Sequence, residues 1–325
     1  MLQSVLVASA LGGVALLLWR RRHCGEARPR LLLVTNFEYV ANGRDYAKED
    51  LYLQAELRVR GFTVASVHPN DLTEADFAYS DHVLFRNTGT ALTTHAASLD
   101  RWRRFQAAGA DHGKLVNNLQ LKGDVCSEGG KQHLLELTRL GGYPIIDAHL
   151  VGTFLDSACK ADGELMIKPL RGADSMGLRR VSGGGELRNL AAADPEMLEQ
   201  FVVQRLVSFD YEVSFYFVGE CFAYALRTGG PGSRWEMAAY SHEQNAATWD
   251  ADMAFAHCFV KWNGTSRGVV RVDGVRETSS GRLLLMEIED YNPYLSLELL
   301  TPTARRDVVD LLARSIREER VGATT

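Results

Sequence analysis

Two apolar runs near the carboxyl end of the chain, residues 268–275 and 283–289, are joined by a polar segment centred on Ser279, Ser280 and Gly281. Small and polar residues between two such runs are typical of a tight turn between antiparallel strands. The stretch therefore predicts a β-hairpin. Because an isolated hairpin is barely stable in water, it also predicts a larger antiparallel sheet in this half of the chain.

The predicted hairpin carries three carboxylates. Side chains alternate along a strand, so Glu287 and Glu289 are expected on one face and Met286 and Ile288 on the other. The turn brings the preceding strand alongside and places Asp273 near the two glutamates. Three neighbouring carboxylates repel one another unless a cation neutralises them, and oxygen ligands suit Mg²⁺. We therefore expect these three residues to bind Mg²⁺, or Mn²⁺; the alternative is a solvated acidic face.

The amino-terminal half predicts a small α/β domain over residues 28–116. Apolar runs with β character alternate there with helical patterns, and Gly61 ends the first helix. This order is typical of a mostly parallel sheet with helices packed against it. The predicted strands are residues 30–35, 62–67 and 82–86, and the predicted helices are residues 46–60 and 98–108.

The remaining chain, residues 117–320, predicts an α+β region with antiparallel sheets, in two parts of about residues 117–203 and 204–320. A second hairpin is expected to turn at Gly219 and Glu220. The closing helix follows Pro302, a residue suited to a first helical turn. Besides the first hairpin, the predicted strands are residues 164–168, 201–206, 212–218 and 221–226, and the predicted helices are residues 131–140 and 303–317.

Several basic residues stand at the ends of predicted strands or helices, where they can reach a charged ligand. Lys131 opens a helix and Lys168 closes a strand, and such lysines can lie along phosphate groups. The loop that follows contains Gly172 and offers backbone amides to phosphate oxygens. Arg227 and Arg271 end or begin strands that lead to the acidic hairpin, and both can hold a charged substrate. Glycine turns and surface arginines are also common without any ligand.

Residues 2–19 contain no charged side chain, and Arg20, Arg21 and Arg22 follow directly. As a helix this run spans roughly 27 Å, close to the ~30 Å hydrocarbon core of a bilayer. The basic residues follow the apolar run, whereas in a cleaved signal peptide they precede it. We expect a single-span anchor over residues 1–23 with the rest facing the cytosol, at the endoplasmic reticulum or outer mitochondrial membrane. A short buried helix or a weak targeting sequence is the alternative.

Composition narrows the class of protein further. The chain has 325 residues, enough for about two domains, and its net charge of −5 argues against nucleic acid as a main partner. Its five cysteines are scattered and never spaced as CxxC, which predicts reduced thiols and neither a zinc site nor a disulfide framework. The nine histidines show no metal-ligand spacing such as HExxH.

Six short motifs follow one another in the sequence: KQHLLEL at residues 131–137, KPLRG at 168–172, VVQ at 202–204, YEVS at 211–214, RVDGV at 271–275 and LMEIE at 285–289. In this order, over about residues 117–300, they resemble the ATP-grasp superfamily of carboxylate–amine ligases. The most similar branch contains glutathione-synthetase-like enzymes and enzymes of the O-ureido-serine cyclo-ligase type. The resemblance implies an ATP-grasp fold, in which two α+β subdomains grip ATP, preceded by a small α/β domain.

The resemblance also implies a ligand for each motif. The implied contacts are Lys131 and Lys168 for the phosphates of ATP, with Lys168 also near the adenine, Gln204, Arg205 and Leu206 for the adenine, Glu212 for the ribose, and Asp273, Glu287 and Glu289 for Mg²⁺. Gly172 is expected to add a backbone amide at the phosphates, and Arg271, with Arg227 second, is the residue that we expect to hold an acyl phosphate.

The chain is therefore expected to be a membrane-anchored, Mg²⁺-dependent ligase that uses ATP to join a small-molecule carboxylate to an amine through an acyl phosphate. Two alternatives from other classes stay open: an ATP-grasp kinase, and a non-catalytic ATP-binding protein at the membrane. The sequence names neither the acid nor the amine, and it does not predict an oligomeric state.

Overall fold

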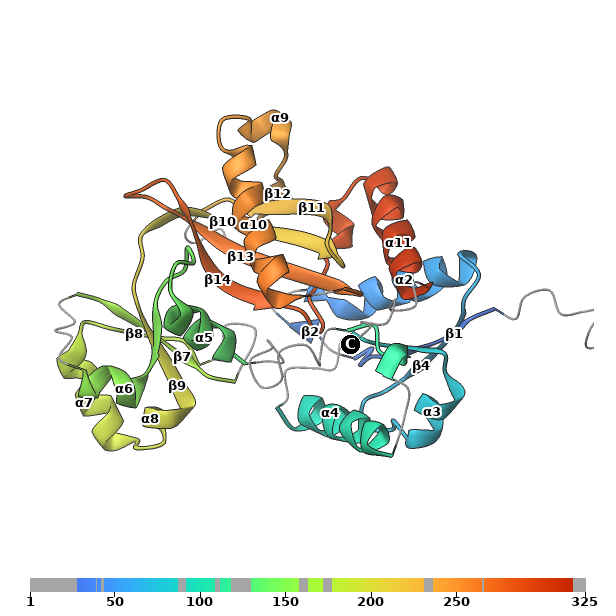
Figure 1. Ribbon diagram of the computed structural model, residues 1–325, viewed down its shortest axis with the longest axis horizontal. Helices are drawn as coiled ribbons and strands as arrows, with labels where there is room; N and C mark the ends of the chain where they lie inside the picture. Colours follow the sequence, from blue (N-terminus) through green and yellow to red (C-terminus); the bar gives the residue numbers. More distant parts are fainter. Residues whose placement is uncertain are drawn as a thin grey trace, which may run out of the picture.

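The computed structural model describes residues 28–38, 40–41, 44–86, 92–108, 112–117, 130–157, 163–171, 177–230, 236–264 and 266–317. In this part of the chain, three larger sheets and their helices lie next to one another (Figure 1). The predicted anchor, residues 1–23, lies outside the described residues. No helix within the described ranges combines the length and apolar character needed to cross a bilayer.

The amino-terminal part, blue and cyan in Figure 1, is a three-stranded sheet in the order β4-β1-β5. Both strand pairs are parallel, which confirms the predicted α/β arrangement. Asp45 begins the first long helix by accepting the Lys48 N–H at 3.1 Å, and Gly61 follows that helix with a φ of 88°. The elements are β1 (Arg30–Val34), β2 (Val40–Ala41), β3 (Arg44–Asp45), α2 (Tyr46–Val59), β4 (Thr63–Val67), α3 (Glu74–Tyr79), β5 (His82–Phe85), α4 (Leu92–Ala107) and η1 (His112–Lys114).

A four-stranded antiparallel sheet in the order β6-β9-β7-β8 forms the second unit, at the lower left of Figure 1. Its apolar side chains, including Leu165, Ile167 and Val203, pack against Leu187 and Met197 from the helices on one face. The elements are β6 (Ala148–Leu150), α6 (Val151–Asp156), β7 (Leu165–Pro169), β8 (Arg179–Val181), α7 (Gly184–Ala193), α8 (Met197–Gln200) and β9 (Phe201–Arg205).

The third unit is a five-stranded antiparallel sheet in the order β12-β11-β10-β13-β14. Both predicted hairpins are confirmed, since β10 pairs with β11 and β13 pairs with β14. Its elements are β10 (Phe209–Val218), β11 (Cys221–Thr228), β12 (Met237–Ala239), α9 (His242–Asn245), α10 (Trp249–Asn263), β13 (Val269–Glu277) and β14 (Leu283–Glu289); α5 (Gln132–Leu140) packs with α10 against the same face.

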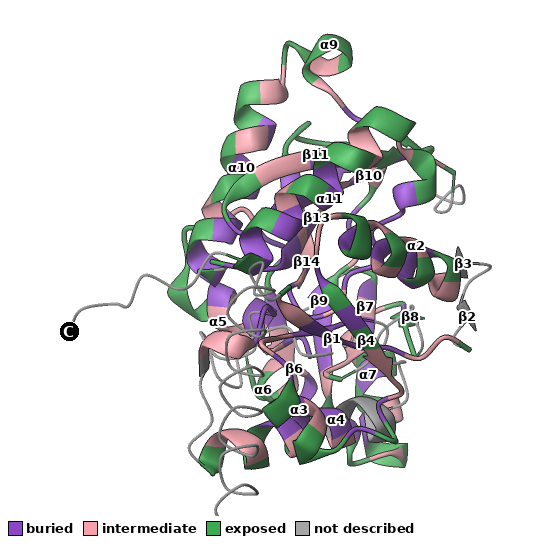
Figure 2. Ribbon diagram, turned by 90° about the vertical axis from the view of Figure 1, so that its right-hand side faces the viewer, coloured by how far each residue is buried: buried purple, intermediate pink, exposed green. Residues whose placement is uncertain are grey.

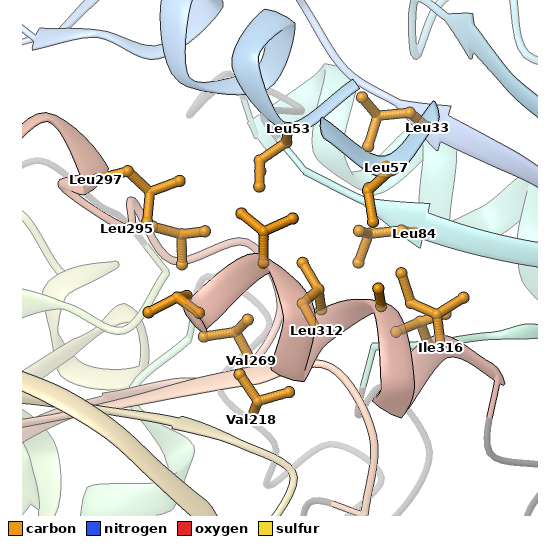
Figure 3. Packing of buried hydrophobic residues seen from close by; sticks show 14 of the residues in the cluster. Leu33, Leu53, Leu57, Leu84, Val218, Val269, Leu295, Leu297, Leu312 and Ile316 are labelled. Carbon is orange, nitrogen blue, oxygen red and sulfur yellow. The ribbon is translucent and has the colours of Figure 1, made fainter. Parts of the chain in front are cut away.

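Helix α11 (Pro302–Arg317) lies between the amino-terminal sheet and one face of the five-stranded sheet, the face that α10 does not cover. Its buried residues Leu312 and Ile316 belong to one cluster with Leu33 and Leu57 on one side and Val218 on the other (Figure 3). In Figure 2 both α10 and α11 show buried residues interspersed with exposed ones, as expected for helices that cover a sheet. The amino-terminal and five-stranded sheets therefore share a hydrophobic core, although they are distant in sequence.

Helix α10 is an element that the sequence pattern did not predict, and α6, α7 and β8 were missed as well. The residues of α10 read WDADMAFAHCFVKWN, and its aromatic side chains have only modest helix propensity. Phe255 and Phe259 are buried against the sheet. Tertiary packing therefore stabilises this helix more than local preference does.

A β-bulge in β14 changes the predicted alternation of side chains. Next to Asp273 the pairing with β13 skips one residue of β14, Met286. Because the extra residue shifts the alternation, Met286 packs near Val275 on the face that carries Glu287. Ile288 packs on the opposite face, in the core that includes α10. The expectation that Met286 and Ile288 share a face is therefore wrong.

Candidate nucleotide and metal site

Three carboxylates meet on the face of the five-stranded sheet that is not covered by α10. Asp273 on β13 lies directly opposite Glu287 on β14, and Glu289 follows two residues later. One oxygen from each lies within 4.8 Å of the others. Their side chains are 14%, 27% and 30% exposed, so a ligand can reach them. The prediction that these three residues lie together is confirmed, and the oxygen set suits a hard divalent cation.

Two cationic side chains accompany the carboxylates. Arg271 Nη2 lies 2.8 Å from Asp273 Oδ2 and 2.8 Å from Glu289 Oε1. Lys131 Nζ lies 3.2 Å from Glu287 Oε1, and the lysine is only 7% exposed. The five groups together carry a formal charge of −1, three negative against two positive.

The charge state of Glu287 follows from its surroundings. Burial raises the pKa of this carboxyl, but the positive charges of Lys131 and Lys168 outweigh it and lower the pKa to about 2. Glu287 is therefore ionised at neutral pH. Burial, together with the same two lysines, lowers the pKa of nearby His133 to about 4, which leaves the imidazole neutral.

The two lysines come from different units, and the positive charge of each lowers the pKa of Glu287. Lys168 lies in β7 of the four-stranded sheet, while Lys131 is the residue immediately before α5. The backbone N–H of Lys131 donates to the carbonyl of Leu170 at 2.7 Å, and Gly130 forms a bridge with Arg171. These contacts attach the start of α5 to the end of β7. Of the two predicted phosphate-binding lysines, Lys168 thus comes from the neighbouring sheet, and Lys131 from the segment that links that sheet to α5.

An apolar cluster with one unsatisfied acceptor lies where the two sheets meet. Gln204 is 2% exposed and its Nε2 donates to the carbonyl of Ile146 at 2.6 Å. That bond fixes the orientation of the amide, and no donor among the described residues reaches its Oε1. Ile146 belongs to a cluster with Val207, Val275, Leu284 and Met286. Apolar side chains beside a buried acceptor fit a flat base with an exocyclic amine, such as adenine.

Sequence analysis missed the apolar part of this arrangement, notably Val207 and Met286. Both adjoin predicted site residues, Val207 after Leu206 and Met286 before Glu287, and this adjacency was a usable signal. The other two predicted adenine contacts are constrained. Arg205 is turned outward, where its Nη2 lies 3.0 Å from Glu277 Oε1. The N–H of Leu206 already donates to the carbonyl of Glu164 at 2.8 Å, so this N–H is not available to a base.

Glu212 lies on the same face of the sheet as the carboxylates. It pairs with Val275, and two residues further along β10 Ser214 pairs with Asp273. Since alternate residues of a strand share a face, Glu212 borders the cluster, on the side of the apolar residues. This position agrees with its predicted place near a ribose.

Arg227 does not join the site. It pairs with Val213, whose side chain is buried in the core that includes α10. Paired residues in a sheet share a face, so Arg227 lies on the opposite face from Asp273. There its guanidinium lies 4.8 Å from the centre of the Tyr211 ring. The prediction that Arg227 helps to hold an acyl phosphate at the carboxylates is therefore wrong; Arg271 is the arginine at that place.

Gly172, the predicted phosphate-loop glycine, lies outside the described residues, as do residues 173–176 of the same loop.

Comparison with known proteins identifies the fold. No protein-family model matches this chain, and no curated protein matches it in sequence. Among solved structures, the D-cycloserine synthetase DcsG matches with a TM-score of 0.66 and 21% identity over 89% of this chain and 100% of that chain. A D-alanine–D-alanine ligase from Bacillus anthracis matches with a TM-score of 0.60 and 13% identity over 89% and 97% of the two chains. The ATP-grasp ligase PsnB, complexed with a minimal precursor, gives 0.57 and 15% over 89% and 99%.

These matches define the class of fold. This chain has the ATP-grasp fold, as its six motifs predict, and it spans nearly the full length of the three proteins named above.

Proposed function

We propose that this protein is an ATP-dependent ligase that joins a carboxylate to an amine through an acyl phosphate. The observation that carries the proposal is the convergence of Asp273, Glu287 and Glu289 with Lys131 and Lys168 at the meeting of two sheets. Such a set suits a metal-bound triphosphate, which needs both oxygen ligands for the ion and cations for the phosphates.

The matched structures support the ATP-dependent part of the proposal. The proteins named above are ligases and a synthetase, and the Bacillus anthracis ligase was also solved with ATP. PsnB was also solved with Mg and ADP.

The chain's own residues have distinct tasks in this proposal. The three carboxylates hold Mg²⁺, which when bound neutralises charge on the phosphates. Lys131 and Lys168 lie along the phosphate oxygens, and Gln204 Oε1 accepts from the base. Arg271 holds the acyl phosphate; it is fixed by two carboxylates, and its Nη1 makes a long bond of 3.5 Å to the carbonyl of Tyr294.

In the proposed reaction a carboxylate oxygen of the substrate attacks the γ-phosphorus of ATP. The bond from that phosphorus to the β,γ-bridging oxygen breaks, and ADP leaves. An amine nitrogen then attacks the acyl carbon, and the carbon–oxygen bond to phosphate breaks. The nitrogen gives up one proton to solvent, so the products are an amide, ADP and inorganic phosphate.

The test is ADP release by the purified full chain with mixtures of small carboxylic acids and amines. Release that requires both an acid and an amine supports the ligase. Release with a hydroxyl acceptor alone indicates a kinase, and ATP binding without ADP in any mixture indicates a non-catalytic protein. The double variant Glu287→Gln/Asp273→Asn should abolish turnover. The matched control is Glu220→Gln, an exposed glutamate in the β10–β11 turn, and it should not.

We also propose that residues 1–23 anchor the protein in a membrane, with the ligase domain in the cytosol. The support is the uncharged run of residues 2–19 and the arginines after it. Expressed in cells, the full chain should stay in the membrane pellet after alkaline carbonate extraction and be open to protease added from the cytosolic side. A variant with Leu11→Arg and Leu16→Arg should be released. Equal release of both forms would exclude the anchor.

A further inference from the structure

We infer that His133 is a positioning residue of this site: its ring holds the start of α5 against the edge of β14 and thereby sets Lys131 opposite Glu287. The inference rests on the proposed function, and it assigns a task to a residue that no metal-ligand or catalytic pattern in the sequence singled out.

The first observation is where the imidazole is bonded. His133 is 1% exposed, and its Nε2 accepts the backbone N–H of Ile288 at 3.2 Å. Ile288 lies between Glu287 and Glu289, so this bond attaches α5 to β14 at the position of the carboxylate cluster.

The second observation is that β14 is the last strand of its sheet. An edge strand has outward N–H groups with no strand partner to accept them, and something else must pair with them. The chain that includes α5 does so at two points. His133 accepts from Ile288, and the carbonyl of Pro144 accepts from Leu285 at 2.8 Å. The segment therefore clamps the edge on both sides of Glu287.

The third observation concerns Lys131, which lies two residues before His133. Lys131 is bonded through its backbone to Leu170 at the end of β7 and through its side chain to Glu287. Residues 131–133 thus touch both sheets that would enclose ATP. The charged contact of Lys131 must be shared with phosphates when nucleotide binds. The His133–Ile288 bond involves no charge and no ligand, so it keeps α5 in place while the lysine changes partners.

Two substitutions separate the acceptor atom from the bulk of the ring. The side-chain oxygen of glutamine reaches about as far as Nε2, whereas that of asparagine reaches only about as far as Nδ1. His133→Gln can keep the bond to Ile288, and His133→Asn cannot. Leu134→Ala is the matched control, since Leu134 is a fully buried neighbour that packs in the core.

The experiment titrates Mg²⁺ in the presence of ATP and follows binding by calorimetry on the full chain. Loss of a residue that orients metal ligands typically weakens metal binding about 10- to 100-fold. We expect a shift of this size for His133→Asn and little shift for His133→Gln. Leu134→Ala should lower the unfolding temperature without moving the Mg²⁺ titration. Equal titrations for the Asn and Gln variants, or an equal shift in Leu134→Ala, would overturn the inference.

A second measurement keeps the inference distinct from the proposed function. Hydrogen–deuterium exchange of the Ile288 amide, without nucleotide, should be faster in His133→Asn than in the wild type and unchanged in His133→Gln. Unchanged exchange in both variants would refute the bond. A different outcome is a wild type that shows the expected exchange pattern and yet binds neither ATP nor Mg²⁺. That result would refute the proposed function and leave only the structural contact between His133 and Ile288.

Discussion

Replacing Arg271 by methionine removes the cation that links two of the three site carboxylates. The guanidinium makes bonds of 2.8–3.0 Å to Asp273 and an ion pair of 2.8 Å to Glu289, and its side chain is 13% exposed. Methionine fills much of the same volume without charge. The formal charge of the cluster then changes from −1 to −2, with Lys131 as the remaining paired cation.

The size of the effect follows from these distances. Two unit charges 4.8 Å apart interact by about 3.5 kcal/mol at an effective dielectric constant of about 20. Removing one partner of a buried ion pair typically costs about 3–5 kcal/mol, in agreement with that figure. At an unfolding entropy of about 2.1 cal/mol/K per residue, about 3 kcal/mol in a chain of 325 residues corresponds to an unfolding temperature lowered by roughly 4–5 °C.

The assay is thermal unfolding of the wild type and Arg271→Met with chelator and with excess Mg²⁺. A divalent ion bound by the three carboxylates replaces the lost charge, and at about 100 times its Kd it stabilises the fold by about 2.7 kcal/mol. Mg²⁺ should therefore raise the unfolding temperature of Arg271→Met more than that of the wild type.

Arg276→Met is the matched control for this experiment. Arg276 is also buried, belongs to the same strand and lies 2.6 Å from Asp252, but on the opposite face of the sheet. It should lose comparable stability and recover none of it with Mg²⁺. If the two variants respond to Mg²⁺ alike, or if Arg271→Met is as stable as the wild type in chelator, the electrostatic reasoning fails.

Three further results are expected. Gly274→Ala should lower the free energy of unfolding by about 1–3 kcal/mol in urea titrations, because a Cβ there would lie 2.8 Å from Phe255 Cζ. Glu287→Gln should be less stable than the wild type above about pH 4.5, and the gap should close as the pH falls toward 2, because the pKa of this carboxyl is lowered from 4.5 to about 2; a gap independent of pH would contradict this. Gln204→Leu should weaken ATP binding by roughly 5- to 10-fold in calorimetry and reduce discrimination against GTP, the equivalent of about one hydrogen bond; unchanged affinity would remove Gln204 from the base site.

The parts of the fold that were predictable have a strong local period or strong punctuation. Helix α2 ends just before Gly61, and the β13–β14 hairpin has its turn residues between two apolar runs. Helix α10 was not predictable in the same way, since burial of its aromatic residues, a tertiary effect, stabilises it. The bulge at Met286 could not be predicted from the sequence for a related reason. Strict alternation of side chains is a property of a regular strand, and an extra residue is revealed only by the pairing with the neighbouring strand.

For the candidate site, residue types and local spacing found the carboxylates, because the trio lies within one hairpin. The face of Arg227 depends instead on its register with β10, which the sequence did not supply. His133 was overlooked for a different reason. A lone histidine next to apolar residues is normally part of a core, and its bond to Ile288 joins residues 155 positions apart.

The segment that follows β14 is held by side chains of the amino-terminal domain. Glu49 of α2 accepts the N–H groups of Leu295 and Leu297 at 2.9 and 3.1 Å. Arg86, after β5, donates to Glu49 at 2.7 Å and to the carbonyl of Pro293 at 2.8 Å.

The amino-terminal domain thus fixes the chain leaving Glu289 through buried charged groups, while His133 fixes the edge of the same strand. The four-stranded sheet, by contrast, meets the cluster through Lys168 and the short link from Lys131 to Leu170. In the proposed ATP-dependent ligase, this arrangement separates a fixed part of the site, on β14, from a part that can move, on the four-stranded sheet. In that proposal the carboxylates would keep their geometry because the amino-terminal domain and His133 both hold their strand, and the sheet that carries Lys168 could adjust to nucleotide without moving them.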